Sequence, residues 1–237
     1  MTVKNTELPR ENCCAENKPQ NEFSTKAYLF IKRLFDIITS LVLLILISPL
    51  LLVLSILVYV DDPGKVFYGH VRIGKNGKPF KMWKFRSMYM NADKMIDLLT
   101  PEQAKQYYTE FKIDNDPRIT RIGNFLRKTS LDELPQLFNV ICNDMSLVGP
   151  RPEVRKYVEL YTEEQRRVLS VRPGITDYAS IEYVDENTIL GQAEDADKAY
   201  VEQILPDKIC YNMKYIEHRS VKEYFKIIFL TIWSIVH

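Results

Sequence analysis

The chain has 237 residues, enough for one domain with a substantial core or for one domain plus a membrane segment. Its 32 basic and 31 acidic residues leave a net charge of +1, which argues against a nucleic-acid-binding protein. The four cysteines lack CxxC or zinc-ligand spacing, and the three histidines are spread far apart, so neither a histidine metal site nor a Ser-His triad is expected.

Residues 1–26 form a polar segment rich in Asn, Glu and Lys, with almost no apolar periodicity. Such a composition cannot bury enough apolar surface to fold, so we predict a disordered tail. The segment is not a signal peptide, because the apolar run begins too late and no small-residue cleavage site follows it.

Residues 27–62 are predicted to associate with a membrane. Between Leu34 and Val60 the only charged residue is Asp36. A straight helix over this run would reach roughly 40 Å, enough to cross a bilayer with tilt. A helix this long and apolar on every face is not typical of a soluble core.

Ser48-Pro49 interrupts this run near its middle. Proline removes a helical hydrogen bond, and each arm beside it would be too short to cross a bilayer alone. The residues themselves allow two topologies: a kinked helix that spans the membrane, or a helical hairpin that enters the membrane and returns. Lys32 and Arg33 place the N-terminal end on the cytoplasmic side in either case.

Residues 65–88 are predicted to form a β-hairpin. Two aromatic-rich runs flank Gly74–Gly77, and the Asn-Gly pair within this segment is a strong turn signal. The second run carries Lys84 and Arg86. These cations fit either an ordinary solvated strand face or a basic face near lipid headgroups or substrate phosphates.

The central stretch, residues 127–152, places the adjacent acids Asp132 and Glu133 among basic residues. With Ser130 or Asp132 as N-cap, both acids would lie at a helix N-terminus, where negative charge is favoured. The pair could therefore be ordinary caps, or carboxylates that act as a nucleophile or hold a metal. Two prolines hold Arg151 in a stiff segment suited to phosphate binding.

The C-terminal run Val221–Val236 is apolar and aromatic, but its dense part is too short to span a membrane. We expect an interfacial helix with Trp233 at headgroup depth. The alternative is a helix docked on the domain core.

Six segments together resemble the bacterial sugar transferases, the monotopic phosphoglycosyl transferases, over roughly residues 30–235. They are KRLFDIITS…SPLL, DDPGKVFY, RIGKNGKPFKMWKFRSM, DPRITRIGNFLRKTSLDELPQLFNVI, DMSLVGPRPE and RPGIT. SLDELPQ and GPRP at this spacing are far more specific than a lone short motif.

This resemblance implies transfer of a sugar-1-phosphate from a UDP-sugar to a polyprenyl (undecaprenyl) phosphate, with release of UMP. In the family this is the first membrane step of capsule, exopolysaccharide, O-antigen or glycoprotein glycan assembly, at the cytoplasmic face of the bacterial inner membrane. Asp132 matches the nucleophile that takes the phosphosugar, and Glu133 matches the acid that assists it with Mg²⁺. Arg127 and Arg151 match residues associated with phosphate or nucleotide contacts.

The resemblance also implies that the apolar segment is a re-entrant helix broken at Ser48-Pro49, with the domain in the cytoplasm. One departure concerns Asp177–Ser180, where the family more commonly has Gly-Trp-Ala-Gln. These residues could contact the nucleotide sugar or reflect ordinary packing variation, and the sequence favours neither.

We therefore predict an α+β fold: a mostly helical cytoplasmic domain with a small β-hairpin, an N-terminal re-entrant membrane helix hairpin and interfacial amphipathic helices. The predicted boundaries are a tail at 1–26, the membrane helix at 27–62 and the catalytic domain at 63–237. Membrane lipids are expected partners, and an oligomer is not excluded. The alternative is a catalytically idle, membrane-anchored protein that binds UDP-sugar or lipid phosphate.

The predicted substrate-binding residues are Arg127, Pro150, Arg151, Lys84, Arg86 and Arg172, and the predicted metal ligands are Asp132 and Glu133.

Overall fold

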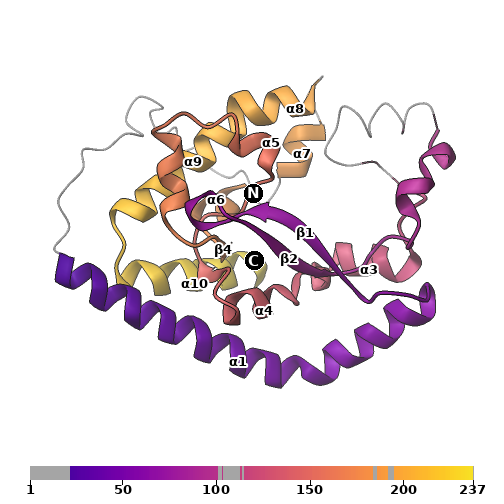
Figure 1. Cartoon of the computed structure of the whole chain (residues 1–237), viewed down its shortest axis with the longest axis horizontal. Helices are drawn as coiled ribbons and strands as arrows, with labels where there is room; N and C mark the ends of the chain where they lie inside the picture. The colour runs from indigo at the N-terminus through magenta and orange to yellow at the C-terminus, as the bar shows by residue number, and fades with distance from the viewer. Residues whose placement is uncertain are drawn as a thin grey trace.

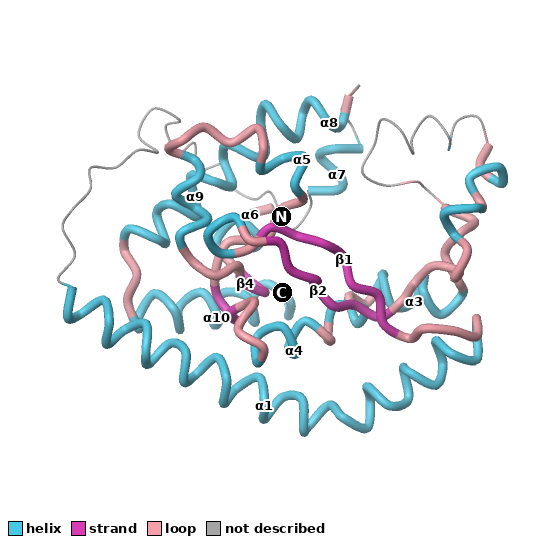
Figure 2. The backbone as a smooth tube through the Cα atoms, viewed as in Figure 1, coloured by secondary structure: helices cyan, strands magenta, loops and turns pink. Residues whose placement is uncertain are grey.

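The computed structural model of the protein describes residues 22–100, 103, 113, 115–183, 186–191 and 195–236. Helices dominate these residues, and the strands form two small two-stranded sheets (Figure 2). The predicted α+β class, with a mostly helical domain and one β-hairpin, is confirmed at this level.

The first half of the chain begins with the long helix α1 and continues through the hairpin to the short segments around residues 92–148. Its elements are α1 (Glu22–Asp61), β1 (Phe67–Ile73), η2 (Lys75–Gly77), β2 (Pro79–Phe85), η3 (Ala92–Lys94), η4 (Ile96–Leu98), α3 (Arg121–Lys128), η5 (Leu131–Glu133), α4 (Gln136–Ile141) and β3 (Ser146–Val148).

The second half is mostly helical and contains one short strand. Its elements are α5 (Arg155–Val158), η6 (Gln165–Ser170), β4 (Gly174–Thr176), α6 (Tyr178–Glu182), α7 (Glu186–Gly191), α8 (Ala196–Ala199), the π-helix η7 (Tyr200–Ile204), α9 (Leu205–Glu217) and α10 (Val221–Val236). Strands β3 and β4 pair in parallel, although they are far apart in sequence.

Helix α1 runs along one side of the domain and bends near its middle, so that both of its ends turn toward the domain (Figure 1). It begins at Glu22, inside the segment predicted to be a tail, and residues 1–21 lie outside the described residues. Instead of a helix hairpin broken at Ser48-Pro49, the structure has one continuous helix with Pro49 inside it. The Ser48 hydroxyl donates to the Ile45 carbonyl at 2.8 Å, and this kind of back-bonding accompanies a bend rather than a break.

The surface of α1 is mostly apolar and uncovered. Lys26–Asp61 is the one stretch of the described residues long and apolar enough to cross a membrane. Within its most apolar 18-residue stretch, only 17% is buried against the rest of the protein. A helix in a soluble core, by contrast, is mostly covered. Leu46 and Val60 are 69% and 71% exposed. A continuous apolar surface of this kind supports the predicted membrane association.

The β-hairpin forms as predicted. Strands β1 and β2 pair antiparallel, with Tyr68 opposite Lys84. Asn76 and Gly77 adopt φ values of 57° and 73° in the turn, a left-handed conformation that favours Asn and Gly.

The second arm of α1 packs on this hairpin and on α3. Leu54 and Val58 lie in one buried cluster with Phe85 of β2 and Leu126 of α3. Asp61, at the end of α1, accepts a hydrogen bond of 2.9 Å from the Ile122 backbone N–H at the start of α3. The C-terminal end of α1 is therefore fixed to the domain.

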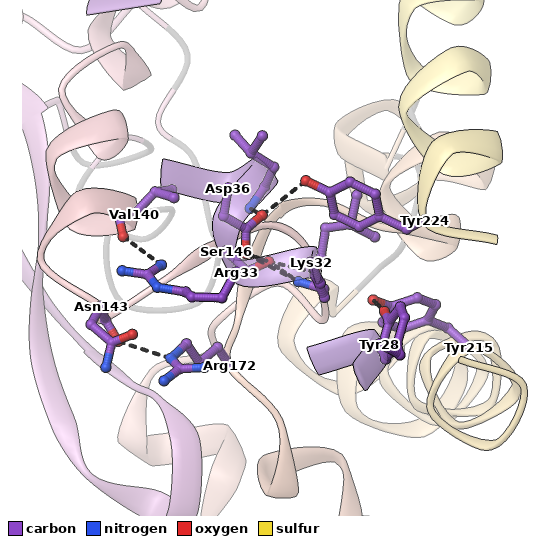
Figure 3. A network of polar contacts seen from close by, with 12 residues as sticks. Tyr28, Lys32, Arg33, Asp36, Val140, Asn143, Ser146, Arg172, Tyr215 and Tyr224 are labelled. Atoms are coloured by element: carbon purple, nitrogen blue, oxygen red, sulfur yellow. Dashed lines mark hydrogen bonds and ion pairs between the residues drawn. The ribbon is translucent and has the colours of Figure 1, made fainter. Parts of the chain in front are cut away.

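The first arm of α1 is fixed to the domain by a buried polar network (Figure 3). Asp36 is 2% exposed and accepts hydrogen bonds from the Ser146 hydroxyl at 2.8 Å and the Leu147 N–H at 3.0 Å. The Tyr224 hydroxyl donates to it at 2.9 Å, and Lys32 pairs with it at 3.4 Å. The single charge in the apolar run is thus a structural anchor, and Ser146 does more than close a helix end.

Helix α10 is docked on the domain core, which was the alternative considered for it, and also exposes apolar side chains. Tyr224 and Ile227 are buried against the core, whereas Phe229 and Trp233 are 63% and 54% exposed. The Phe225 ring lies against Phe35 of α1, with ring centroids 5.0 Å apart. The helix is docked on the domain and presents a second apolar face next to α1; the depth of Trp233 in a membrane stays a prediction.

Candidate active site

A cavity of about 1540 Å³ lies between the hairpin, the turn before α4 and the C-terminal helices. Asp132 and Glu133 line it, together with four of the predicted substrate-binding cations and Pro150. The four cations are Lys84, Arg86, Arg127 and Arg151. The structure therefore brings together residues that are up to 67 positions apart in sequence, from Lys84 to Arg151.

Of the two predicted N-caps, Ser130 occupies that position in the helix that holds the two acids, whereas Asp132 lies inside this helix. Asp132 and Glu133 lie in the 3-10 helix η5, and α4 begins only at Gln136, with Pro135 as its cap. Ser130 has φ 54° and its side chain makes no capping bond. This left-handed conformation is rare for a residue with a side chain, and it turns the chain tightly just before the acids.

This turn brings both carboxylates to one cation. The Lys84 Nζ lies 2.6 Å from the Glu133 Oε1 and 3.5 Å from the Asp132 Oδ2. Adjacent residues of an ideal α-helix point about 100° apart, so this convergence depends on the tighter turn. A single positive charge can therefore be shared by both acids.

The two acids have opposite pKa shifts. Burial raises the pKa of Asp132, and the neighbouring Glu133 charge adds to that shift despite Lys84. Burial would also raise the pKa of Glu133, but Arg151 and Lys84 outweigh it and lower the pKa to about 2. Glu133 therefore stays ionised in any physiological buffer, whereas Asp132 is the more easily protonated of the two.

Arg151 is positioned by the packing of two glycines. A Cβ on Gly174 would lie 2.1 Å from the Gly149 nitrogen, so only glycine allows the two loops to approach this closely. The Gly174 N–H donates to the Pro150 carbonyl at 2.9 Å, and the Arg151 N–H donates to the Asp177 carboxylate at 2.8 Å. The Arg151 guanidinium then reaches Glu133 at 3.2 Å.

Asp177, the first residue of the segment that departs from the family pattern, has a structural role here. It is 1% exposed and caps α6 through the Ser180 N–H, in addition to its bond with Arg151. Ala179 and Ser180 line the cavity, whereas the Tyr178 hydroxyl donates to Glu223 of α10. The segment is therefore partly packing and partly cavity wall.

The predicted cations Arg86 and Arg172 do not contact the two acids in the same way as Lys84 and Arg151 do. The Arg86 guanidinium binds the carboxylate and the carbonyl of Asp62, at the end of α1. Arg172 does not line the cavity that holds Asp132; its Nε donates to the Asn143 carbonyl at 3.1 Å, beside a second, smaller cavity. Their roles in substrate binding stay predictions. Arg127 lines the main cavity and donates to the Ser87 hydroxyl at 2.8 Å.

Sequence reasoning missed two residues that complete this site. Asn139 is 1% exposed, and its side chain accepts from the Trp83 N–H and donates to the Lys81 carbonyl, which fixes β2 and Lys84 against α4. Arg72 lines the cavity and donates to the Pro152 carbonyl, and within the described part of the chain its buried Nε has no hydrogen-bond partner. Arg72 occurs in the quoted RIGKNGKPF motif, but nothing in the local pattern pointed to the cavity.

The acids fit the predicted metal. Mg²⁺ is usually bound by one or two carboxylates plus substrate phosphates and water. Asp132 and Glu133 supply two such oxygens at one point, where they now hold the Lys84 ammonium. The described residues contain no cluster of three potential metal ligands, so substrate oxygens would have to complete the coordination.

The chain matches known proteins along most of its length. A family model described as bacterial sugar transferase matches residues 27–237. Over 160 residues, the chain is 48% identical to an undecaprenyl-phosphate galactose phosphotransferase of Salmonella typhimurium, covering 66% of this chain and 33% of that protein. Over 208 residues, it is 39% identical to a UDP-glucose:undecaprenyl-phosphate glucose-1-phosphate transferase of Escherichia coli, covering 86% and 40%.

A shorter relative is the exopolysaccharide production protein ExoY of Rhizobium meliloti, 47% identical over 148 residues, covering 61% of this chain and 66% of that protein. The chain spans about a third of the length of the Salmonella relative. Because the family match extends over α1, the cavity and α10, the chain belongs to the bacterial sugar transferase family.

Proposed function

We propose that the protein transfers a sugar-1-phosphate from a UDP-sugar to a polyprenyl phosphate and releases UMP, through a phosphoaspartyl intermediate on Asp132. The observation that carries the proposal is the recessed Asp132 beside an ionised Glu133, under shared cations, on a domain fixed to an apolar helix. Membership of the family and the names of the relatives support it. The reaction would be the first membrane step in assembly of a glycan.

Two displacements at one phosphorus would complete the transfer. The Asp132 carboxylate attacks the sugar-bearing phosphorus of the UDP-sugar, and the bond to the other phosphate breaks, so that UMP leaves with the bonding electrons. An oxygen of the polyprenyl phosphate then attacks the same phosphorus and breaks its bond to Asp132. The product is a polyprenyl diphosphosugar, and the carboxylate is regenerated for the next cycle.

The surrounding residues have distinct roles in this scheme. Arg127 and Arg151 line the cavity as fixed guanidinium groups, which suit the oxygens of a diphosphate. Lys84 offsets the charge of the two acids and would offset the charge that develops on UMP. Mg²⁺, when bound, would supply further neutralisation of the diphosphate. Because its pKa is raised, Asp132 loses nucleophilic character in acid earlier than an ordinary aspartate.

The same proposal includes a re-entrant, monotopic placement on the cytoplasmic face of the inner membrane. Both ends of α1 pack on one domain: Tyr28 hydrogen-bonds Tyr215 at 3.0 Å, and Asp61 binds the start of α3. A helix whose two ends contact the same side of one domain cannot place those ends on opposite sides of a bilayer. Lys32 and Arg33 near the first end favour the cytoplasmic side.

Labelling tests this topology. In a background without other cysteines, Lys26→Cys and Lys65→Cys should both resist a membrane-impermeant maleimide added to intact spheroplasts, and both should react after lysis. Labelling of only one of the two before lysis would refute the re-entrant arrangement.

The catalytic proposal is tested with detergent-solubilised protein, Mg²⁺ and a panel of UDP-sugars carrying ³²P in the sugar-bearing phosphate. We expect UMP release and a labelled protein band that survives denaturation. Asp132→Asn should abolish both signals, whereas Asp97→Asn, at an exposed acid outside the cavity, should keep them. UDP release would indicate an ordinary glycosyltransferase, and binding without release would indicate an idle binding protein.

A further inference from the structure

A second cavity of about 140 Å³ lies beside the first arm of α1, separate from the proposed active site. The two cavities share only Val171 among their lining residues. Cavities that hold drug-sized ligands are roughly 300–1,000 Å³, so this one is too small for a nucleotide sugar. A group no larger than a phosphate with a short substituent fits it better.

Five cations line this small cavity, against one acid, Asp36. They are Lys32, Arg33, Lys75, Arg172 and Arg219. Asp36 is already bonded to Ser146, Leu147, Tyr224 and Lys32, so its charge is used within the network (Figure 3).

The other four cations form no salt bridge in the described part of the chain, although Asp36 is near enough to favour the charge of Arg33. Arg33 donates to the carbonyls of Val140 and Ile141, and Arg172 donates to that of Asn143. The buried Nε of Arg219 has no hydrogen-bond partner among the described residues. Lys32, Arg33 and Arg172 are near enough to disfavour one another's charge. Such a cluster is stabilised by an anion.

The surroundings indicate where the anion comes from. Leu29 of α1 lines the cavity and is 42% exposed, and the neighbouring Phe30 is 71% exposed. The cavity therefore opens at the border between cationic side chains and the apolar surface of α1. A lipid with an anionic headgroup matches both parts, because its phosphate would meet the guanidinium groups while its chains follow the apolar helix.

We propose that this cavity binds the phosphate group of an anionic bilayer phospholipid, as a site separate from the one where the sugar phosphate is transferred. The phosphate would take its hydrogen bonds from the cations that line the cavity without a salt bridge, which are Arg33, Lys75, Arg172 and Arg219. Binding there ties the loop between α4 and β3, which carries Asn143, to the membrane surface next to α1.

Native mass spectrometry of the full chain in detergent micelles tests the proposal, with phosphatidylglycerol, phosphatidylcholine and inorganic phosphate as separate probes. We expect one tightly held phosphatidylglycerol, weaker phosphatidylcholine binding and negligible inorganic phosphate. Arg172→Gln combined with Arg219→Gln should weaken phosphatidylglycerol binding by about tenfold or more for each cation removed. The matched control, Arg155→Gln combined with Arg166→Gln, removes two exposed cations outside the cavity and should bind like the wild type.

Lys75→Gln keeps the test informative if the double variant fails to fold, because Lys75 is exposed in the hairpin turn. It should also weaken phosphatidylglycerol binding. Equal binding by the wild type, the cavity variants and the control would overturn the proposal. Preference for inorganic phosphate over phosphatidylglycerol would overturn the assignment to a lipid. The readout is binding alone, so it is independent of whether UMP is released.

Discussion

Replacing Asp36 with leucine tests whether one buried carboxylate fixes the membrane helix to the domain. Asp36 accepts three hydrogen bonds, from Ser146, Leu147 and Tyr224, and pairs with Lys32. The substitution leaves the mostly buried Lys32 ammonium without its carboxylate, and the three hydrogen-bond donors lose this acceptor. Loss of one partner of a buried ion pair typically costs about 3–5 kcal/mol.

For a chain of this size, each kcal/mol lowers the melting temperature by about 2–4 °C. We therefore expect Asp36→Leu to melt about 6–20 °C below the wild type, measured by tryptophan fluorescence in one detergent. Asp36→Asn keeps the shape and one acceptor oxygen, so its loss should be smaller.

Two controls separate the network from a general effect of altering α1. Ser40 is fully buried one turn further along the helix, and the residues that the structure describes offer its hydroxyl no hydrogen-bond partner. Ser40→Ala should therefore be neutral or stabilising, since it removes an unsatisfied polar group. Adding Lys32→Leu to Asp36→Leu should recover part of the loss, because the unpaired ammonium is removed as well. If Asp36→Leu melted with the wild type, the network would not be what fixes the first arm.

Three further predictions concern the cavity. Because the folded-state pKa of Glu133 is about 2, below its ordinary value, its ion pairs stabilise the fold above about pH 4.5 and are lost as pH falls toward 2. Glu133→Gln should therefore be less stable than the wild type at pH 7, by at most about 3 kcal/mol, and should converge with it in acid melts. Lys84→Met removes the shared cation, so the pKa of Asp132 should rise further and the acid limb of UMP release should move to higher pH; an unmoved limb would contradict the assignment. Gly174→Ala should displace Gly149 and reduce UMP release by about tenfold or more with a stability loss of about 1–3 kcal/mol, and unchanged kinetics would show that the loop tolerates the Cβ.

Local patterns were sufficient for the elements whose cause is local. The β-hairpin follows from Asn76-Gly77 between two aromatic-rich runs, and the last helix follows from a mostly apolar and aromatic segment, observed as Val221–Val236. The adjacency of Asp132 and Glu133 was also visible in the sequence. Their geometry was not, because the left-handed Ser130 depends on how the ends of η5 are held by the surrounding structure.

Contacts between distant segments account for what the sequence did not predict. Asp36 and Ser146 are 110 positions apart, and neither belongs to a pattern that points to the other. Arg172 lies only two residues before Gly174, which packs on the loop that carries Arg151, yet its side chain reaches the second cavity. The motif therefore indicated that the backbone at Arg172 lies near the loop of Arg151. It did not indicate the direction in which the Arg172 side chain points.

Helix α1 supports the proposed active site as well as contacting the membrane. Asp62 binds Arg86, two residues beyond Lys84, and Asp61 binds the start of α3, which carries Arg127 near its other end. Asp36 binds β3, which leads directly into the loop of Arg151. Three of the cations around the acids are thus connected to a helix whose outer surface is apolar. In the proposed membrane placement, such connections would fix the distance of the cavity from the lipid, as the proposed reaction between a soluble nucleotide sugar and a membrane-bound phosphate requires.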